Sequence, residues 1–225
     1  MPYSKKHNTL FIHIPKTGGK SFEVAMGIAS EKEVIKYKWR SFFNRASKFG
    51  LNLTRDHKSL ERLWGVHDIS LALQHLTYAE IELLNLLQEN ILKNSIKVTI
   101  VRNPFDRVVS SFKHSGSSYI NFLDFIEKYY YSDNKNHGIL SHKRPQIDFI
   151  RDKKGTIVVD NLIRFENIGE DFKFFTKQFK IKSNSLGHIG KSKNNVSYKT
   201  YYCEKSYEIV LKLFKEDINY FGYKF

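Results

Sequence analysis

The chain has 225 residues, a formal net charge of +14 and a single cysteine, Cys203. The length suits one domain over residues 1–225, with residues 30–74 as a candidate helical insertion, and it allows a substantial buried core. The lone cysteine excludes an intrachain disulfide and fits a reducing compartment, whereas the positive charge indicates an anionic ligand or partner.

The N-terminal segment offers neither a signal peptide nor a membrane span. Lys5 and Lys6 precede a short apolar run, but His13, Pro15 and Lys16 interrupt it. We therefore expect a cytoplasmic protein without a membrane span. Nucleic acid is not expected as a partner, because the lysines are spread along the chain and no helix-turn-helix, zinc-finger or RNA-recognition motif is present.

The first predicted strand, Leu10–Ile14, runs into a loop with two adjacent glycines, Gly18 and Gly19. Two glycines let the backbone fold closely around an anion while successive N–H groups point inward. The next helix is predicted from apolar residues that recur at helical spacing, namely Phe22, Ala25, Met26 and Ala29. The segment therefore predicts a site for a phosphate-like group at the start of a helix.

This loop differs from the loop of nucleotide triphosphatases, which also ends in glycine, lysine and serine. That loop needs a first glycine at the position held here by Ile14. The chain instead places Lys16 ahead of the two glycines, so that the ammonium approaches the ligand from the end of the strand.

Two histidines downstream are candidates for a general base, because histidine titrates near neutral pH. His67 is adjacent to Asp68, and His75 precedes a capping-box pattern formed by Thr77 and Glu80. The helix that opens there is expected to continue through the apolar residues Leu83, Leu84, Leu87 and Ile91. We favour His75, since a histidine at a helix entrance can project into a cleft.

The second predicted strand, Lys97–Val101, leads into Arg102, Asn103 and Pro104 and then into a helix. The helix is predicted from the spacing of Phe105, Val108, Val109 and Phe112. A guanidinium at the strand end can bind phosphate through two parallel hydrogen bonds, and Ser110 can add a donor from the same side. The segment therefore predicts a second phosphate-binding point.

The C-terminal third continues the alternation of strands and helices. Ile157–Val159 is predicted as a strand, and Ile163–Asn167 as a strand that leaves into a helix. The helix is predicted from the spacing of Ile168, Phe172, Phe175 and Phe179. The fold class is therefore α/β, with a central, mainly parallel sheet flanked by helices. No spacing of histidine, cysteine and carboxylate residues suggests a metal site.

The segment Pro15–Ser21 resembles the 5′-phosphosulfate loop of sulfotransferases, and is most similar to that of the carbohydrate O-sulfotransferases, including the heparan sulfate 2-O type. Their loop commonly reads Pro-Lys-Thr-Gly-Gly-Thr-Ser, so Lys20 stands in place of a threonine. Arg102 and Ser110 match the family's Arg-(Asn/Asp)-Pro…Arg…Ser pattern. The resemblance implies a P-loop-like sulfotransferase fold, in a bacterial or viral version of the catalytic domain alone.

The same resemblance implies a donor and a set of site residues. The donor is 3′-phosphoadenosine 5′-phosphosulfate (PAPS), which leaves adenosine 3′,5′-bisphosphate as product, without a metal. The implied cofactor-binding residues are Lys16, Thr17, Gly18, Gly19, Lys20, Ser21, Arg102, Ser110 and Lys193. The implied catalytic residues are Lys16 at the leaving oxygen and His75 or His67 as the base. Arg144 and Gln146 belong to a segment that resembles the family's acceptor side.

The predicted function is transfer of a sulfuryl group from PAPS to a hydroxyl of a carbohydrate, with an acidic glycan as an acceptor that suits the charge. Residues 30–74 are then an acceptor-side subdomain or a solvated basic helix. Two alternatives stay open. A small-molecule kinase requires ATP and magnesium and is disfavoured by Ile14. A non-catalytic polyanion-binding protein requires no turnover and predicts binding that weakens with salt.

Overall fold

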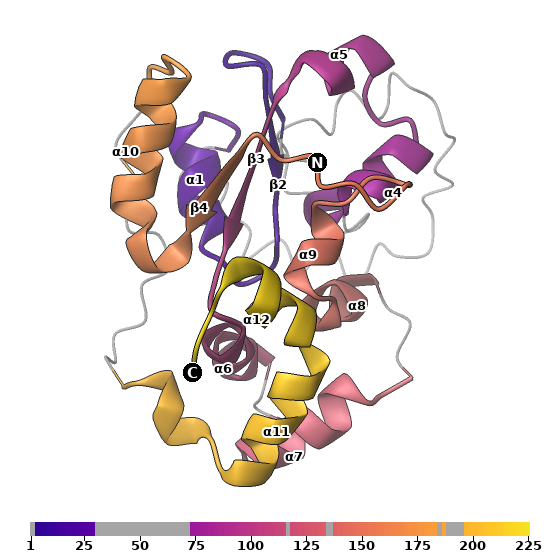
Figure 1. The fold of residues 1–225 in the computed structure, drawn as a ribbon, viewed down its shortest axis with the longest axis vertical. Helices are drawn as coiled ribbons and strands as arrows, with labels where there is room; N and C mark the ends of the chain where they lie inside the picture. The colour runs from indigo at the N-terminus through magenta and orange to yellow at the C-terminus, as the bar shows by residue number, and fades with distance from the viewer. Residues whose placement is uncertain (1–2, 30–72, 116–117, 134–136, 184–185, 188–195) are drawn as a thin grey trace, which may run out of the picture.

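The computed structural model describes residues 3–29, 73–115, 118–133, 137–183, 186–187 and 196–225 (Figure 1). Almost all of the predicted insertion 30–74, together with His67 and Lys193, lies outside the described residues. Among the helices that the structure describes, none combines the length and the apolar character needed to cross a membrane. The single-domain assignment for residues 1–225 stays a prediction.

Four strands form one sheet in the order β1-β2-β3-β4. Their bounds are β1 Tyr3–Ser4, β2 Thr9–Ile12, β3 Ile96–Val101 and β4 Asn161–Arg164. β2, β3 and β4 are parallel, with Phe11 opposite Val98 and Ile100 opposite Ile163. The short β1 pairs antiparallel with β2. The prediction of a mainly parallel sheet flanked by helices is confirmed.

Helices connect the strands and fill the C-terminal half. In the first part of the chain they are α1 Gly19–Ala25, η1 Leu73–His75, α4 Tyr78–Leu83, α5 Glu89–Asn94 and α6 Pro104–Ser115. The middle part holds α7 Phe122–Phe125, the π-helical turn η3 Ile126–Tyr130, α8 His137–Lys143 and α9 Gln146–Phe149. The last part holds η4 Phe165–Asn167, α10 Ile168–Gln178, η5 Tyr198–Tyr201, α11 Glu204–Leu213 and α12 Lys215–Phe221.

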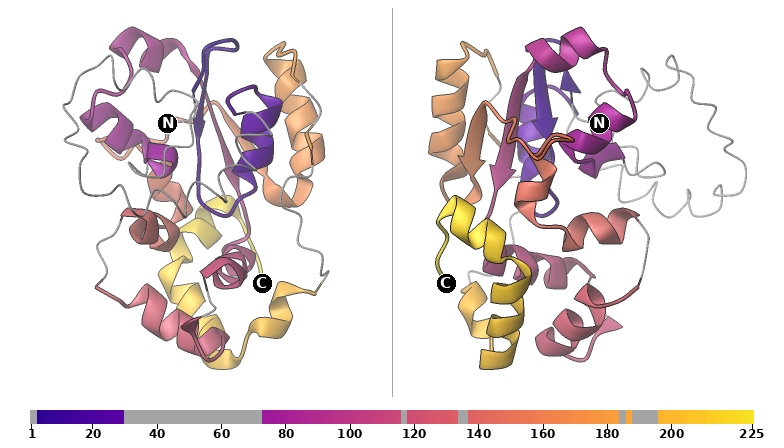
Figure 2. Two further views of the ribbon diagram at one scale, coloured as in Figure 1. Left: turned by 180° about the vertical axis from the view of Figure 1, so that it is seen from behind. Right: turned by 45° about the vertical axis from the view of Figure 1, so that its right-hand side comes forward.

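The helices cover both faces of the sheet, because its strands are apolar on both sides. Phe11 of β2 faces α1 and α10, and its ring centroid lies 4.4 Å from that of Phe22. Leu10 and Ile12 point to the opposite face, where they join a buried cluster with α4 and α9. Figures 1 and 2 show these two layers, with α1 and α10 on one side and α4, α5 and α9 on the other.

A third apolar cluster lies below the sheet as drawn in Figure 1 and is built from helices alone. It joins α6, α7, η3 and α11 through buried side chains that include Val108, Phe125, Tyr130 and Val210. α6 begins where β3 ends and enters this cluster, so it connects the sheet to the helical half.

Two of the predicted helices end well before the expected residue, and the strand predicted at Ile163–Asn167 is β4 only as far as Arg164, where η4 follows. The helix expected from Thr77 to Ile91 does start with the capping box, in which Thr77 and Glu80 bond to each other's backbone N–H groups. It ends at Leu83, however, because Asn85 adopts a left-handed conformation with φ 49° and the chain restarts as α5. α1 likewise ends at Ala25, since Gly27 is left-handed with φ 64°.

The strand predicted at Ile157–Val159 was wrong. This segment turns back on the chain before it: Ile157 forms an isolated bridge with Arg151, and the Val158 N–H donates to the Ile150 carbonyl at 3.0 Å. The ladder with β3 begins only at Asn161, opposite Val98. The β-branched residues there pack on the edge of a core cluster, which explains the apolar pattern without a strand.

Candidate active site

The predicted loop and Arg102 lie at the carboxyl ends of β2 and β3, where ligands bind in open α/β sheets. β2 ends at Ile12 and leads into the loop of residues 13–18, whereas β3 ends at Val101 and leads into Arg102. Because the strands are parallel neighbours, the loop and Arg102 meet at one edge. The Arg102 Nη1 donates to the Lys16 carbonyl at 3.0 Å.

The carbonyl oxygens of the loop bind donors that come from other parts of the structure or from the loop's own hydroxyl. The acceptors and donors are His13 O with His75 Nδ1 at 2.9 Å, Ile14 O with Thr17 Oγ1 at 2.9 Å, Pro15 O with Arg107 Nε at 3.1 Å, Lys16 O with Arg102 Nη1 at 3.0 Å, and Gly18 O with Ser21 N at 3.1 Å. These bonds fix the orientation of five of the peptide groups in the loop, and therefore the direction of the N–H groups between them.

The backbone N–H groups of the loop are available to a ligand. Those of Thr17, Gly18 and Gly19 donate to no acceptor among the described residues, although Thr17 and Gly19 are buried. Lys16 and Gly18 have positive φ angles of 69° and 84°, which bends the chain into a concave turn. Buried N–H groups need partners, and successive N–H groups in such a turn form an anion-binding nest.

Both glycines are required by their surroundings. Gly18 is left-handed, and a Cβ there would lie 2.9 Å from the Phe165 ring. A Cβ on Gly19 would overlap the His13 ring. The His13 ring is in turn held by Glu23, whose Oε1 lies 2.7 Å from Nδ1 in a buried pair. The tight loop therefore depends on packing from β2, α1 and η4.

Lys16 carries a cation that is poorly solvated. Burial, together with the nearby positive charges of Lys20 and Arg102, lowers the pKa of its ammonium to about 8. Lys20 itself is exposed at the first turn of α1. Three positive groups thus converge at the loop, and an anion bound among them would restore the ordinary pKa of Lys16.

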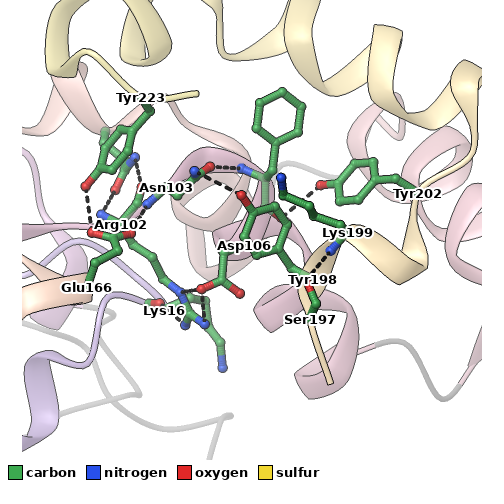
Figure 3. Close-up of polar contacts among 12 residues, drawn as sticks. Lys16, Arg102, Asn103, Asp106, Glu166, Ser197, Tyr198, Lys199, Tyr202 and Tyr223 are labelled. Atoms are coloured by element: carbon green, nitrogen blue, oxygen red, sulfur yellow. Dashed lines mark hydrogen bonds and ion pairs between the residues drawn. The ribbon is translucent and has the colours of Figure 1, made fainter. Parts of the chain in front are cut away.

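Arg102 is held from three sides, and Figure 3 shows its polar contacts with Asp106 and Lys16. Its Nε and Nη2 both lie 2.8 Å from Oδ2 of Asp106, its Nη1 binds the Lys16 carbonyl, and its guanidinium lies 4.1 Å from the centroid of the Phe165 ring. Ser110 lies two turns further along α6 and is partly exposed. The predicted second phosphate-binding point is therefore beside the loop.

His75 is placed at the same edge and is neutral. Desolvation, together with the neighbouring His13 and His142 rings, holds its pKa well below the usual range. Because a carbonyl oxygen only accepts, the Nδ1 atom must carry the proton donated to the His13 carbonyl at 2.9 Å. Nε2 is therefore the unprotonated nitrogen, which is the atom that a general base uses.

His142 is a residue that the sequence reasoning did not select. Its ring centroid lies 6.3 Å from that of His75, and its buried Nδ1 has no hydrogen-bond partner among the described residues. Burial and the positive charges of Arg107 and Lys16 lower the pKa of His142 to about 3. The available signal was its position two residues before Arg144, in the segment already assigned to the acceptor side.

Arg144 and Gln146 lie in different environments. Arg144 is partly exposed and forms an ion pair with Glu80, with Nη1 and Oε1 at 2.9 Å. Gln146 is fully buried, and its amide binds the backbone N–H and carbonyl of Arg102 at 2.9 and 2.8 Å. Gln146 therefore positions Arg102, and we do not retain it as an acceptor contact.

Arg107 connects the loop to α8. It is almost fully buried and donates to the carbonyls of Pro15, Ser141, His142 and Arg144 at 2.9 to 3.4 Å. A planar guanidinium with several fixed donors suits this task better than an ammonium does. The sequence showed Arg107 only as part of a motif, and its role depends on contacts with residues far along the chain.

Comparison with known proteins agrees with this geometry. A model of the sulfotransferase family matches residues 2–224. No curated protein and no solved structure matches the chain. The match concerns the family as a whole, so the heparan sulfate 2-O type stays a prediction. Because the matched region spans almost the entire sequence and includes the loop, Arg102 and Ser110, the chain belongs to the sulfotransferase family.

Proposed function

We propose that the protein transfers a sulfuryl group from PAPS to a hydroxyl of a carbohydrate. The observation that supports this most directly is the loop itself. Five of its carbonyls accept hydrogen bonds, the N–H groups of Thr17, Gly18 and Gly19 are unpaired among the described residues, and the cation of Lys16 belongs to the same loop. The family membership supports sulfuryl transfer in general. The chemistry of the loop and of Arg102 supports the proposed donor, whereas the proposed acceptor is supported by the resemblance and by the charge of the chain.

The residues present fit the two anionic groups of PAPS. The amides of Thr17, Gly18 and Gly19 with the ammonium groups of Lys16 and Lys20 suit the 5′-phosphosulfate, and Arg102 with Ser110 suits the 3′-phosphate. The Ser21 N–H already donates to the Gly18 carbonyl, so Ser21 would contribute its hydroxyl. The family pattern adds Lys193. When bound, PAPS supplies an activated sulfuryl group, and the protein's task is to hold the reactants in line and to stabilise moving charge. Lys16 is positioned to stabilise the leaving oxygen.

The acceptor hydroxyl needs a base, and we assign this role to Nε2 of His75. Its Nδ1–H is fixed by the His13 carbonyl, so the ring is oriented and Nε2 has the free lone pair. The proton passes from the hydroxyl to Nε2 as the oxygen attacks sulfur. His67 remains the alternative base, and it lies outside the described residues.

The acceptor class rests on the resemblance and on charge. A net charge of +14 favours an acidic glycan, because opposite charges increase the rate of encounter. Arg144 is the candidate acceptor contact on the described surface, where it pairs with Glu80. The neighbouring His142 ring lies 6.3 Å from that of His75. A cytoplasmic location and the absence of nucleic acid as a partner belong to the same proposal.

Calorimetric titration with adenosine 3′,5′-bisphosphate, and with ATP plus magnesium, tests the donor site. We expect micromolar affinity for the bisphosphate, lost in Arg102→Ala and Lys16→Ala. Matched controls are Arg151→Ala and Lys93→Ala. They remove the same charges from ion pairs with Glu216 and Glu89, away from the loop in sequence. Preference for magnesium ATP would favour the kinase, and binding of neither nucleotide would favour the non-catalytic alternative.

Transfer itself is tested with PAPS labelled in the sulfuryl group. The purified protein is incubated with a panel of neutral and acidic glycans, and the label is followed into each acceptor. We expect label in at least one acidic glycan and none with Lys16→Ala. Bisphosphate binding without label in any carbohydrate would preserve the donor and reject the acceptor class.

A further inference from the structure

The ion pair between Arg102 and Asp106 lies inside the proposed donor site. Both Nε and Nη2 of Arg102 contact one oxygen of Asp106, each at 2.8 Å. The two side chains are only 15% and 25% exposed, so water screens the pair weakly. Figure 3 shows the pair next to Lys16, with Tyr198 from η5 drawn close to it.

Asp106 stands between the two residues assigned to the 3′-phosphate. Arg102, Asp106 and Ser110 are spaced four residues apart, and side chains at this spacing share one face of a helix. A phosphate that touches both Arg102 and Ser110 must therefore approach the carboxylate of Asp106.

The remaining donors of Arg102 allow both anions to be present together. A guanidinium has five N–H groups. Two of them point to Asp106 and one to the Lys16 carbonyl, which leaves one N–H on each terminal nitrogen. A phosphate can bind to this outer edge while Asp106 keeps its place. The carboxylate then holds the guanidinium in orientation but repels the phosphate that the guanidinium attracts.

We infer that Asp106 is a positioning residue that limits the affinity for the 3′-phosphate and thereby sets how readily the bisphosphate product leaves. This inference depends on the proposed donor site. The carboxylate of Asp106 has two opposite effects on phosphate binding: its oxygen orients the Arg102 guanidinium, and its negative charge repels the phosphate. Replacement by asparagine distinguishes the two effects, because the amide keeps an acceptor oxygen and loses the charge.

The test compares Asp106→Asn with the wild type in titrations with adenosine 3′,5′-bisphosphate and with adenosine 5′-phosphate. We expect Asp106→Asn to bind the bisphosphate about tenfold more tightly, since removal of a nearby like charge favours an anion. The affinity for the 5′-phosphate should not change. In turnover, the KM for the donor and kcat should both fall, because the product leaves more slowly.

Two further variants complete the design. Asp106→Glu keeps the charge and should bind the bisphosphate with nearly wild-type affinity, which also shows that the helix tolerates substitution. Glu89→Gln on α5 makes the same change of net charge at an exposed pair with Lys93, and should have no effect. A merely structural role of Asp106 predicts that Asp106→Asn binds the bisphosphate more weakly than the wild type, and not more tightly.

Each outcome decides between the inference and the proposed function. Unchanged or weaker bisphosphate binding in Asp106→Asn overturns the inference, as does an equal gain in Glu89→Gln. If the wild type binds no bisphosphate, or if Arg102→Ala retains full affinity, the proposed donor site fails instead. Tighter binding in Asp106→Asn together with loss in Arg102→Ala supports both.

Discussion

Lys16 is the residue at which backbone geometry and charge coincide. Its left-handed φ of 69° costs free energy for a residue with a side chain, and two arginines bind the carbonyls of Pro15 and Lys16 that hold it there. The same turn brings its ammonium into a poorly solvated position where its pKa is about 8. The loop therefore combines a strained backbone with a poorly solvated positive charge at Lys16. A bound anion would stabilise that charge.

The lowered pKa of Lys16 makes anion binding depend on pH. A bound phosphate raises the pKa of Lys16. At a pH where the free protein has lost the ammonium proton of Lys16, binding is therefore accompanied by uptake of a proton. We expect the affinity for the bisphosphate to be constant below pH 8 and to fall as the pH rises above about 8. Lys16→Arg should abolish this fall, because a guanidinium stays charged. Titrations from pH 7 to pH 9 measure it, and an identical slope in both proteins would contradict it.

His75 makes a separate prediction about the chemical step. His75→Asn keeps a nitrogen donor for the His13 carbonyl but removes Nε2, so the loop should stay in place while the base is lost. We expect kcat to fall by about 10²–10⁴ with the affinity for the bisphosphate unchanged. The wild-type rate should persist at acid pH below the usual titration range of histidine, since the pKa of His75 is lowered. A comparable loss only in His67→Gln would transfer the role to His67.

At the scale of elements, α1 packs against His13, the residue that follows β2, through a contact that excludes any side chain at Gly19. Its missing Cβ leaves the space that the His13 ring occupies. We expect Gly19→Ala to lower the free energy of unfolding by about 1–3 kcal/mol, the range for overpacking, and to weaken bisphosphate binding. Gly169→Ala in α10 is the matched control, because nothing lies near its Cβ and alanine favours a helix. Equal stability of the two variants in urea titrations would refute the packing argument.

Local sequence patterns predicted the elements wherever the deciding interactions were local. The capping box of Thr77 and Glu80 forms as expected, and the parallel pairing of β2 with β3 follows from two apolar runs ending in a loop and in Arg102. The prediction that the helix starting after Thr77 continues to Ile91 was wrong, because Asn85 adopts a left-handed conformation that the spacing of apolar residues does not reveal. The prediction of a strand at Ile157–Val159 was wrong, because its β-branched pattern fits a packed turn as well as a strand.

The site residues that the sequence could reveal are likewise those that belong to local motifs. The loop and the segment around Arg102 are each recognised from a short run of consecutive residues. Gln146 meets Arg102, and Arg107 meets Pro15, only through contacts between distant segments. Asp106 could have been found from its spacing to Arg102, since four residues bring two side chains together on a helix.

At the scale of the whole molecule, α6 unites the site with the helical half. It begins just after the carboxyl end of β3, carries Asp106 and Ser110, which belong to or adjoin the proposed donor site, and directs Arg107 into the interior toward α8. The helical cluster around Val108 and Val210 lies below the sheet as drawn in Figure 1 and holds the same helix. A change in that cluster would reach Asp106 through α6, and Arg102 through its ion pair with Asp106.

The net charge leads to a prediction for the whole molecule. A charge of +14 creates a field that attracts a polyanion before any specific contact forms, and salt screens this field. We expect the association rate with an acidic glycan to fall about tenfold or more between ~50 mM and ~200 mM salt, and that with a neutral glycan of equal length to change little. Stopped-flow or surface-binding measurements can follow both association rates.

Lys16→Ala should leave the glycan association nearly unchanged, because it removes one charge of many, but should abolish label transfer from PAPS. Equal loss of both would mean that glycan and donor compete for the loop, whereas salt-independent association would show that the charge does not act on the acceptor.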